Sequence, residues 1–154
     1  MSDDNYKKAL NRAMALCSKS EKCIRDVTSK LTTWGLSSAH QNETIIQELL
    51  KEGFIDEKRY AGSYALDKYR LNKWGRIKIR AMLRSRGLNE KDIEYGLDMI
   101  DQDDYLKMIK EEMSNKKKSI RAGNLFDLKA RLYRFAGSRG YEKEYIHDFI
   151  SKLD

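Results

Sequence analysis

The residues of this chain with the clearest potential for chemistry are arginines and lysines gathered in one central stretch. Residues 68–91 contain nine basic groups and one acidic group. Within this stretch Arg76, Arg80 and Arg84 recur every four residues, so on a helix they fall within an arc of about 80°. Guanidinium groups bind phosphate and carboxylate groups in a bidentate way. The stretch therefore predicts a surface that binds a polyanion or an acidic protein face.

Two basic patches are predicted, and an acidic segment separates them. The main patch, a candidate contact for DNA or for an acidic protein surface, consists of Lys68, Arg70, Lys73, Arg76, Lys78, Arg80 and Arg84. A secondary patch lies in residues 116–139, where eight basic groups accompany one acidic group, and its members are Lys116, Lys117, Lys118, Arg131, Arg134 and Arg139. The whole chain carries a net charge of +7, so the remaining residues are acidic in sum. For either patch alone, a solvated helix face is an equal alternative.

Aromatic residues and a glycine accompany the main patch. Tyr64, Tyr69 and Trp74 are interleaved with its cations and could stack on exposed bases. Packing between helices is the more common role of such residues and is the alternative interpretation. Gly75 comes directly before the arginine helix, where it predicts either a close approach of two backbones or the entry turn of the helix.

Catalytic signatures are missing from the sequence. It contains no phosphate-binding loop, no dinucleotide fingerprint and no HExxH zinc motif. His40 and His147 are solitary, and the acidic run from Asp101 to Asp104 fits the first turn of a helix better than a metal-dependent nuclease site. Cys17 and Cys23 are expected to be reduced and buried. We therefore predict no catalytic residue, no metal, no cofactor and no enzymatic activity.

A repeated helix ending organises the chain. An apolar-periodic helix ends in glycine plus a hydrophobic residue at Gly35-Leu36, Gly87-Leu88 and Gly140-Tyr141, a period of 52 to 53 residues. Proline is absent and strand signals are missing, so the pattern predicts an all-α protein of about nine helices. The expected units are three tandem three-helix repeats at residues 1–54, 55–101 (central and basic) and 102–154.

Core positions support duplication of the second and third units. Ile93, Leu97 and Ile100 follow Gly87 at offsets of six, ten and thirteen residues. The same offsets after Gly140 are occupied by the apolar residues Ile146, Ile150 and Leu153. No stretch is long and apolar enough to span a membrane, and the N-terminus has no apolar signal core, so we expect a cytoplasmic location.

Three segments of the second unit resemble the central repeat of the RecX family, regulators of the RecA recombinase. They are Gly53–Ala61, Lys73–Ile79 and Leu83–Leu88, and the resemblance extends to Cys17-Ser18, Lys30-Leu31 and Trp34-Gly35 in the first unit and to Arg139-Gly140-Tyr141 in the third. Where the family usually has two aspartates and a phenylalanine, this chain has Asp56-Glu57 and Tyr60.

The resemblance implies both a shape and a role. The implied shape is an elongated, curved arrangement of the three units. The implied role is binding of the RecA recombinase, free or assembled on single-stranded DNA, with inhibition of ATP hydrolysis, strand exchange and coprotease activity. Such a protein regulates recombinational DNA repair and the SOS response, with possible direct DNA contact, no membrane partner and a monomer as the simplest state. The alternative is a stand-alone helix-turn-helix-like DNA-binding protein that uses residues 76–86 as its recognition helix.

Overall fold

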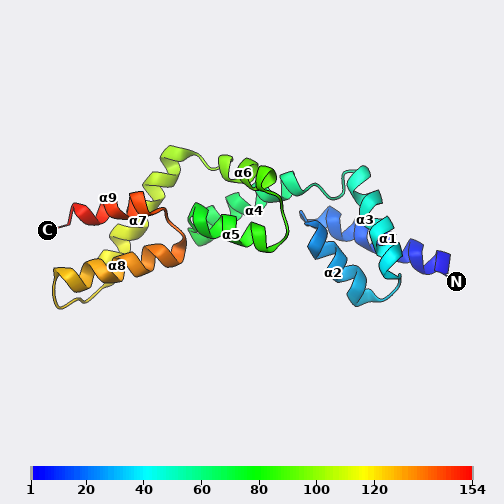
Figure 1. Ribbon diagram of the computed structural model, residues 1–154, viewed down its shortest axis with the longest axis horizontal. Helices are drawn as coiled ribbons and strands as arrows, with labels where there is room; N and C mark the ends of the chain where they lie inside the picture. Colours follow the sequence, from blue (N-terminus) through cyan, green and yellow to red (C-terminus); the bar gives the residue numbers. More distant parts are fainter. Residues whose placement is uncertain (1, 154) are drawn as a thin grey trace.

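The computed structural model describes residues 2–153 as an elongated array of helices (Figure 1). Within these residues there are nine α-helices and no strand. The helices are α1 (Ser2–Lys19), α2 (Ile24–Trp34), α3 (Ala39–Lys51), α4 (Glu57–Asn72), α5 (Arg76–Ser85), α6 (Glu90–Asp98), α7 (Gln102–Ser119), α8 (Leu125–Arg139) and α9 (Lys143–Ser151). The prediction of an all-α, elongated protein of tandem three-helix units is confirmed. The unit boundaries stay a prediction, and their outermost residues, 1 and 154, lie outside the described range.

The repeated glycines end their helices as expected. Gly35, Gly87 and Gly140 have φ values of 67°, 87° and 86°, the left-handed conformation that lets the chain leave a helix and that a side chain would strain. At the other end of a helix, the Asp101 carboxylate accepts a hydrogen bond from the Asp104 backbone N–H at 3.0 Å. The acidic run is therefore a helix start, as predicted.

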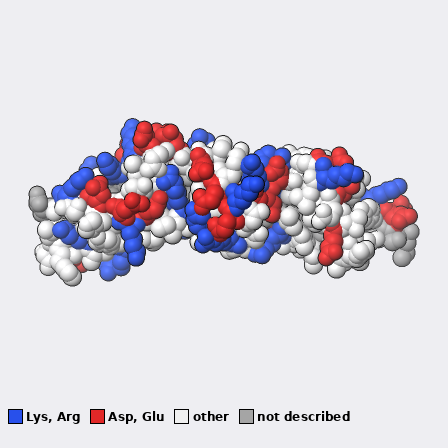
Figure 2. All heavy atoms as spheres, turned by 45° about the horizontal axis from the view of Figure 1, so that its top comes forward, with Lys and Arg blue, Asp and Glu red and all other residues white. Residues whose placement is uncertain are grey.

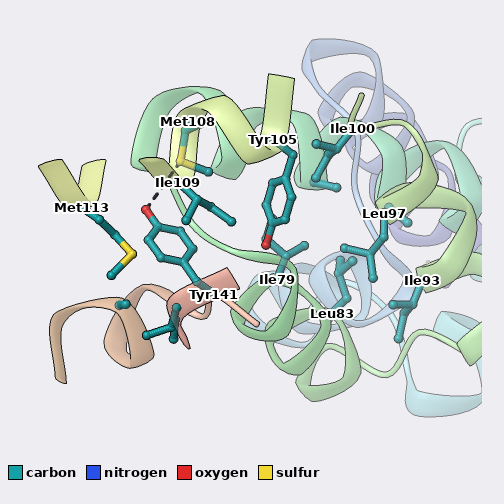
Figure 3. Close-up of a cluster of buried hydrophobic side chains, with 14 of the residues drawn as sticks. Ile79, Leu83, Ile93, Leu97, Ile100, Tyr105, Met108, Ile109, Met113 and Tyr141 are labelled. Carbon is teal, nitrogen blue, oxygen red and sulfur yellow. Dashed lines mark hydrogen bonds between the residues drawn. The ribbon is translucent and has the colours of Figure 1, made fainter. Parts of the chain in front are cut away.

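The apolar residues form two separate cores. One core belongs to α1–α3 and contains Val27, Leu31 and Ile45 among its buried residues. The other is continuous from α4 to α9, so the second and third units share it (Figure 3). The predicted core positions Ile93, Leu97, Ile100, Ile146 and Ile150 are all buried in this shared core, and Leu153 packs against it.

Two glycines bring the second and third units into backbone contact. The Gly75 N–H donates to the Arg139 carbonyl at 2.6 Å, and the Ile77 N–H donates to the Gly140 carbonyl at 3.0 Å. A Cβ atom on Gly75 would lie 2.2 Å from the Gly140 carbonyl oxygen, so no side chain fits there. The predicted close backbone approach at Gly75 is confirmed, and its partner is the glycine that ends α8.

Buried tyrosines reinforce the same junction. The Tyr141 hydroxyl donates to the Lys73 carbonyl at 2.8 Å, and burial raises the pKa of Tyr141 to about 12. The Tyr105 hydroxyl accepts from the Arg76 N–H at 2.9 Å and donates to Glu142, and burial followed by this second bond raises the pKa of Tyr105. Both hydroxyls thus remain neutral hydrogen-bonding groups between the units.

The first unit meets the second through polar side chains. The Ile24 N–H donates to Glu57 Oε2 at 3.0 Å, and Arg86 Nη1 lies 3.5 Å from Asp26 Oδ1. Arg25 donates to the Ser85 carbonyl, and Arg59 forms an ion pair with Glu21. Cys23, at the start of α2, is the residue of the first unit that enters the shared core of α4–α9.

The structure also bears on the two cysteines and on the expected absence of a membrane-spanning helix. Cys17 and Cys23 are free and buried, as predicted, and burial raises the pKa of both thiols. None of the helices in the described part of the chain has the length and apolarity needed to cross a bilayer.

Candidate anion-binding surface

The arginines of α5 point into ion pairs with carboxylates of this same chain. Arg80 pairs with Glu90 at 3.2 Å and also with Glu94, and Arg84 pairs with Glu90. The hydrogen bond from Arg84 lowers the pKa of Glu90. Glu90 and Glu94 lie one turn apart on α6, so they meet arginines that lie one turn apart on α5. These two guanidinium groups are therefore already matched with negative charge.

Arg76 occupies a structural position between the units. Its Nη1 lies 3.4 Å from Glu142 Oε2, its Nη2 donates to Gln102 Oε1 at 2.7 Å, and its guanidinium stacks 4.1 Å from the Tyr105 ring centre. Glu142 begins the third unit's last helix, so the side chain links α5 to α9. The sequence could not reveal this role, because Glu142 lies 66 residues further along the chain.

Two lysines of the predicted main patch share one tryptophan. Lys68 Nζ lies 4.9 Å and Lys78 Nζ 4.4 Å from the centre of the Trp74 ring system. Lys68 also lies 5.5 Å from the Tyr64 ring, and Arg86 approaches the same ring at 5.2 Å. In the described chain, neither lysine has a carboxylate within ion-pair distance. Their charges are held in place by aromatic faces rather than neutralised.

The series of cations and rings continues across the junction into the third unit. Lys78 Nζ donates to the Ser138 carbonyl at 3.3 Å, and Ser138 lies one helical turn from Phe135 on α8. Arg139 and Lys116 lie 4.7 and 5.4 Å from the Phe135 ring. We call this series the cation–aromatic strip and define it as Arg86, Tyr64, Lys68, Trp74, Lys78, Phe135, Arg139 and Lys116.

Arg70 and Lys73 have acidic surroundings instead. Both line a hollow of about 370 Å³ between α4 and α7, together with Asp101, Asp104 and Glu111. Lys73 itself ends α4 in the left-handed conformation, with φ of 57°. The acidic residues that the sequence placed between the two basic blocks therefore lie opposite part of the main patch.

The secondary patch also divides. Arg131 pairs with Asp127 at 3.1 Å, and Arg139 pairs with Glu112 at 2.9 Å while it stacks on Phe135. Lys117 and Lys118 are exposed beside a hollow of about 550 Å³ between α7 and α9, and Arg134 is exposed on α8. Of the six predicted members, Lys116 and Arg139 join the strip and the others lie away from it.

The structure therefore replaces one arginine patch by three environments. Arg76, Arg80 and Arg84 are paired, Arg70 and Lys73 face acidic residues, and Lys68 and Lys78 are held on Trp74. Figure 2 shows the same mixture on one face of the rod, where basic and acidic groups lie side by side along its length. Among the residues of the two predicted patches, Lys68, Lys78 and Lys116 combine a position held by an aromatic ring with a charge that no carboxylate of the described chain pairs with.

The aromatic residues serve the core and the strip together. Tyr64, Tyr69 and Trp74 are partly buried and pack against the shared core, which is the helix-packing role of the alternative interpretation. Tyr69 lies 6.2 Å from Tyr105, ring centre to ring centre. Sequence reasoning named Lys116 and Arg139 in the secondary patch but missed Phe135 and Arg86, and the signal that could have found Phe135 is its place four residues before Arg139.

The histidines are far apart, and neither is part of an acid–base cluster. His40 lines an open hollow of about 650 Å³ on the first unit, whereas His147 Nδ1 lies 3.4 Å from the Tyr133 hydroxyl. Among residues 2–153, no group of three or more His, Cys, Asp or Glu side chains is placed to hold a metal ion.

Comparisons with known proteins agree on one family. A family model described as the second three-helix domain of RecX matches residues 56–97. The regulatory protein RecX of Clostridium tetani (strain Massachusetts / E88) is 32% identical over 158 residues, which covers 98% of this chain and 69% of that protein. The regulatory protein RecX of Chlorobium phaeobacteroides (strain BS1) is 26% identical, with 99% and 98% covered.

Two solved structures share the fold. A crystal structure of regulatory protein RecX superposes with a TM-score of 0.87 at 20% identity, covering 99% of this chain and 74% of that one. The crystal structure of RecX from Lactobacillus salivarius has a TM-score of 0.79 at 19% identity, with 99% and 98% covered. The nine-helix arrangement of this chain is therefore an established fold.

Proposed function

Because this chain belongs to the RecX family, we propose that it binds the RecA recombinase and the filament that RecA forms on single-stranded DNA. In this proposal the bound protein lowers ATP hydrolysis, strand exchange and coprotease activity, and so regulates recombinational repair and the SOS response in the cytoplasm. The protein acts as a binding module and catalyses no reaction of its own.

The observation that carries the proposal is the cation–aromatic strip on an elongated body. The strip runs from the second unit into the third, across a junction fixed by backbone contacts. A long body can follow an extended partner, and many weak contacts then add by avidity. Lysines held on aromatic faces suit DNA phosphates or acidic recombinase side chains, and the partly buried rings beside them suit contact with bases.

The test is a DNA-dependent ATPase assay of the recombinase with this protein titrated in. We expect the wild-type protein to inhibit, and the double variant Lys68→Glu with Lys78→Glu to require at least about ten times more protein for the same inhibition. The matched control is Lys7→Glu with Lys8→Glu, two exposed lysines of α1 outside the strip. Helix content measured by circular dichroism should be the same for all three proteins.

Two results would overturn parts of the proposal. If the wild-type protein leaves the ATPase unchanged and does not bind the filament, recombinase modulation is wrong. If the strip variant inhibits as well as the control variant, modulation stands but the strip is not the contact. In that case the candidates are the patch members that lie outside the strip and form no ion pair in the described chain, namely Arg70, Lys73, Lys117, Lys118 and Arg134.

The arginines of α5 are a poorer choice for the test. Reversal of Arg76 would place a carboxylate beside Glu142 and disturb the junction between units, so loss of inhibition would not identify a contact. Reversal of Arg80 or Arg84 would likewise create repulsion with Glu90 inside the second unit. The predicted contribution of these three residues to partner binding stays a prediction.

The stand-alone DNA-binding alternative gains little from this geometry. A recognition helix needs its basic side chains free for base edges and phosphates, whereas Arg80 and Arg84 of α5 are paired with Glu90 and Glu94 of α6. Salt titration on naked duplex DNA separates the two functions. Steep salt dependence with sequence preference in the absence of recombinase supports the alternative, and weak binding to DNA alone supports modulation.

A further inference from the structure

One face of α8 is apolar and partly exposed in the described chain, where the Tyr133 hydroxyl at its edge lies 3.4 Å from His147 Nδ1 of α9. Phe126 is 84% exposed and Tyr133 is 42% exposed. Ala130 and Gly137 complete a stripe with spacings of four, three and four residues, which places all four on one side of the helix within about 80°. The buried residues Leu132 and Ala136 lie about 120° and 80° from Phe126 around the helix, on the side that packs against the core. In Figure 1, α8 lies at the C-terminal end of the rod and runs roughly along its length.

The stripe alternates large and small residues in a self-complementary order. When two copies of α8 lie antiparallel about a two-fold axis halfway between Ala130 and Tyr133, Phe126 of one copy faces Gly137 of the other. Ala130 then faces Tyr133. Each aromatic ring therefore meets a small residue, and a Cβ atom placed on Gly137 has no neighbour within 4 Å, so the space above it is open. An isologous interface requires this kind of self-matching surface.

The charges beside the stripe match in the same arrangement. Asp127 and Arg134 lie on the same flank of the stripe, about 80° to 100° from Phe126 around the helix. In the antiparallel pair, Arg134 of one copy and Asp127 of the other differ by about 3 Å in height along the helix axis. The Asp127 carboxylate already pairs with Arg131 and is 38% exposed, so it has room for a second cation.

From this match of size and charge, we propose that the protein self-associates through α8 as an antiparallel two-fold dimer. The pair buries on the order of 700 Å² in total, since each copy contributes two aromatic side chains and two small ones. That area is below the range of stable interfaces, so we expect a weak dimer that forms only at high protein concentration. The inference does not rest on the recombinase proposal, and it differs from the monomer expected from the sequence as the simplest state.

Sedimentation velocity over a range from about 10 µM to 1 mM tests the association itself. We expect the wild-type protein to shift toward a dimer, and Phe126→Ser to stay monomeric, because a side chain that is 84% exposed contributes little to the fold. The matched control is Leu71→Ser, an exposed apolar residue of α4 at 78% exposure, which should dimerise like the wild type. A wild-type protein that stays monomeric at 1 mM overturns the proposal.

Cysteine cross-linking tests the register. The variants Phe126→Cys and Gly137→Cys, mixed and mildly oxidised, should form a heterodimeric disulfide, because the two positions face each other. Either variant alone should cross-link poorly, since equivalent positions are 11 residues or about 16 Å apart along the axis. The native Cys17 and Cys23 are buried and should not interfere. Equal cross-linking of the single variants, or none in the mixture, overturns the antiparallel dimer.

Discussion

The two junctions between successive units are built from different interactions. Between the second and third units, the backbones of Gly75 and Gly140 touch and the apolar core is continuous. Between the first and second units, the hydrogen bonds and ion pairs are polar contacts such as Arg86 with Asp26 and Ile24 with Glu57, and Cys23 is the residue of the first unit that is buried in the shared core. The second and third units therefore form one tightly joined pair, and the first unit is attached to it mainly by polar contacts that salt should weaken.

This difference matters for the proposed contact surface. The cation–aromatic strip lies on the tightly joined pair and depends on the Gly75–Gly140 contact to keep Lys78 beside α8. The first unit, by contrast, can change its orientation at the cost of polar contacts that are partly exchanged for water. We infer that the strip has a fixed shape, whereas the first unit adapts to a partner.

The largest expected effect comes from a side chain at the tight junction. Gly75→Val places a Cβ about 2.2 Å from the Gly140 carbonyl oxygen, where backbone and not a flexible side chain must move. We expect a loss of about 3 kcal/mol or more in unfolding free energy, measured by urea denaturation. Gly137→Ala is the matched control, because open space surrounds that glycine, and it should not destabilise.

A small loss for Gly75→Val would mean that the second and third units separate easily. The backbone contact between Gly75 and Gly140 would then contribute little to stability, and the strip would not keep one shape across the junction. Hydrogen exchange of the Ile77 amide, which donates to Gly140, distinguishes local separation from global unfolding.

Particular residues show what the sequence could predict of the fold. The glycine stops at Gly35, Gly87 and Gly140 and the close approach at Gly75 were predictable, because each depends on the absence of a side chain at one position. The partner of Gly75 was not predictable. The contact between residues 75 and 140 depends on the tertiary packing of α8 against α5, which local sequence does not reveal.

The candidate site was predictable in composition and not in arrangement. The basic residues of the main patch do lie on neighbouring helices, as the sequence predicts. Arg76 and Arg80, however, form ion pairs with Glu142, Glu90 and Glu94, so their charges are already compensated within the chain. The pattern of Glu90 and Glu94, one turn apart on the following helix, was the available signal. The exposed apolar stripe of α8 could not be predicted from the sequence. Its residues are interspersed with the buried ones of the same helix, so the sequence alone does not show which apolar side faces the core.

The polar junction should be the one that salt loosens. The double variant Arg25→Ala with Arg59→Ala removes two contacts across it, to the Ser85 carbonyl and to Glu21. We expect a loss of about 1 kcal/mol in overall stability but a clearly broader distance distribution in small-angle X-ray scattering, and wild-type protein in 1 M NaCl should broaden similarly. The control, Arg131→Ala with Lys152→Ala, removes two pairs inside helices and should leave the distribution unchanged. An unchanged distribution for the junction variant would make both junctions equally rigid.

The smallest expected effect is a pH dependence at the polar junction. Burial raises the pKa of Glu57, so its neutral form is favoured in the folded protein, and its contribution to stability falls as pH rises from below its ordinary value through the raised one. Glu57→Gln mimics the neutral form and keeps an acceptor for the Ile24 N–H, which should stabilise the protein by less than about 1 kcal/mol at pH 7 and by nothing near pH 3. Urea denaturation at both pH values, with the exposed Glu48→Gln as control, measures this difference.

Destabilisation by Glu57→Gln at pH 7 would show that the hydrogen bond from the Ile24 N–H to the charged carboxylate outweighs the cost of burying that charge. The first junction would then gain strength from ionisation, in contrast to the backbone contact of Gly75 and Gly140, which does not titrate.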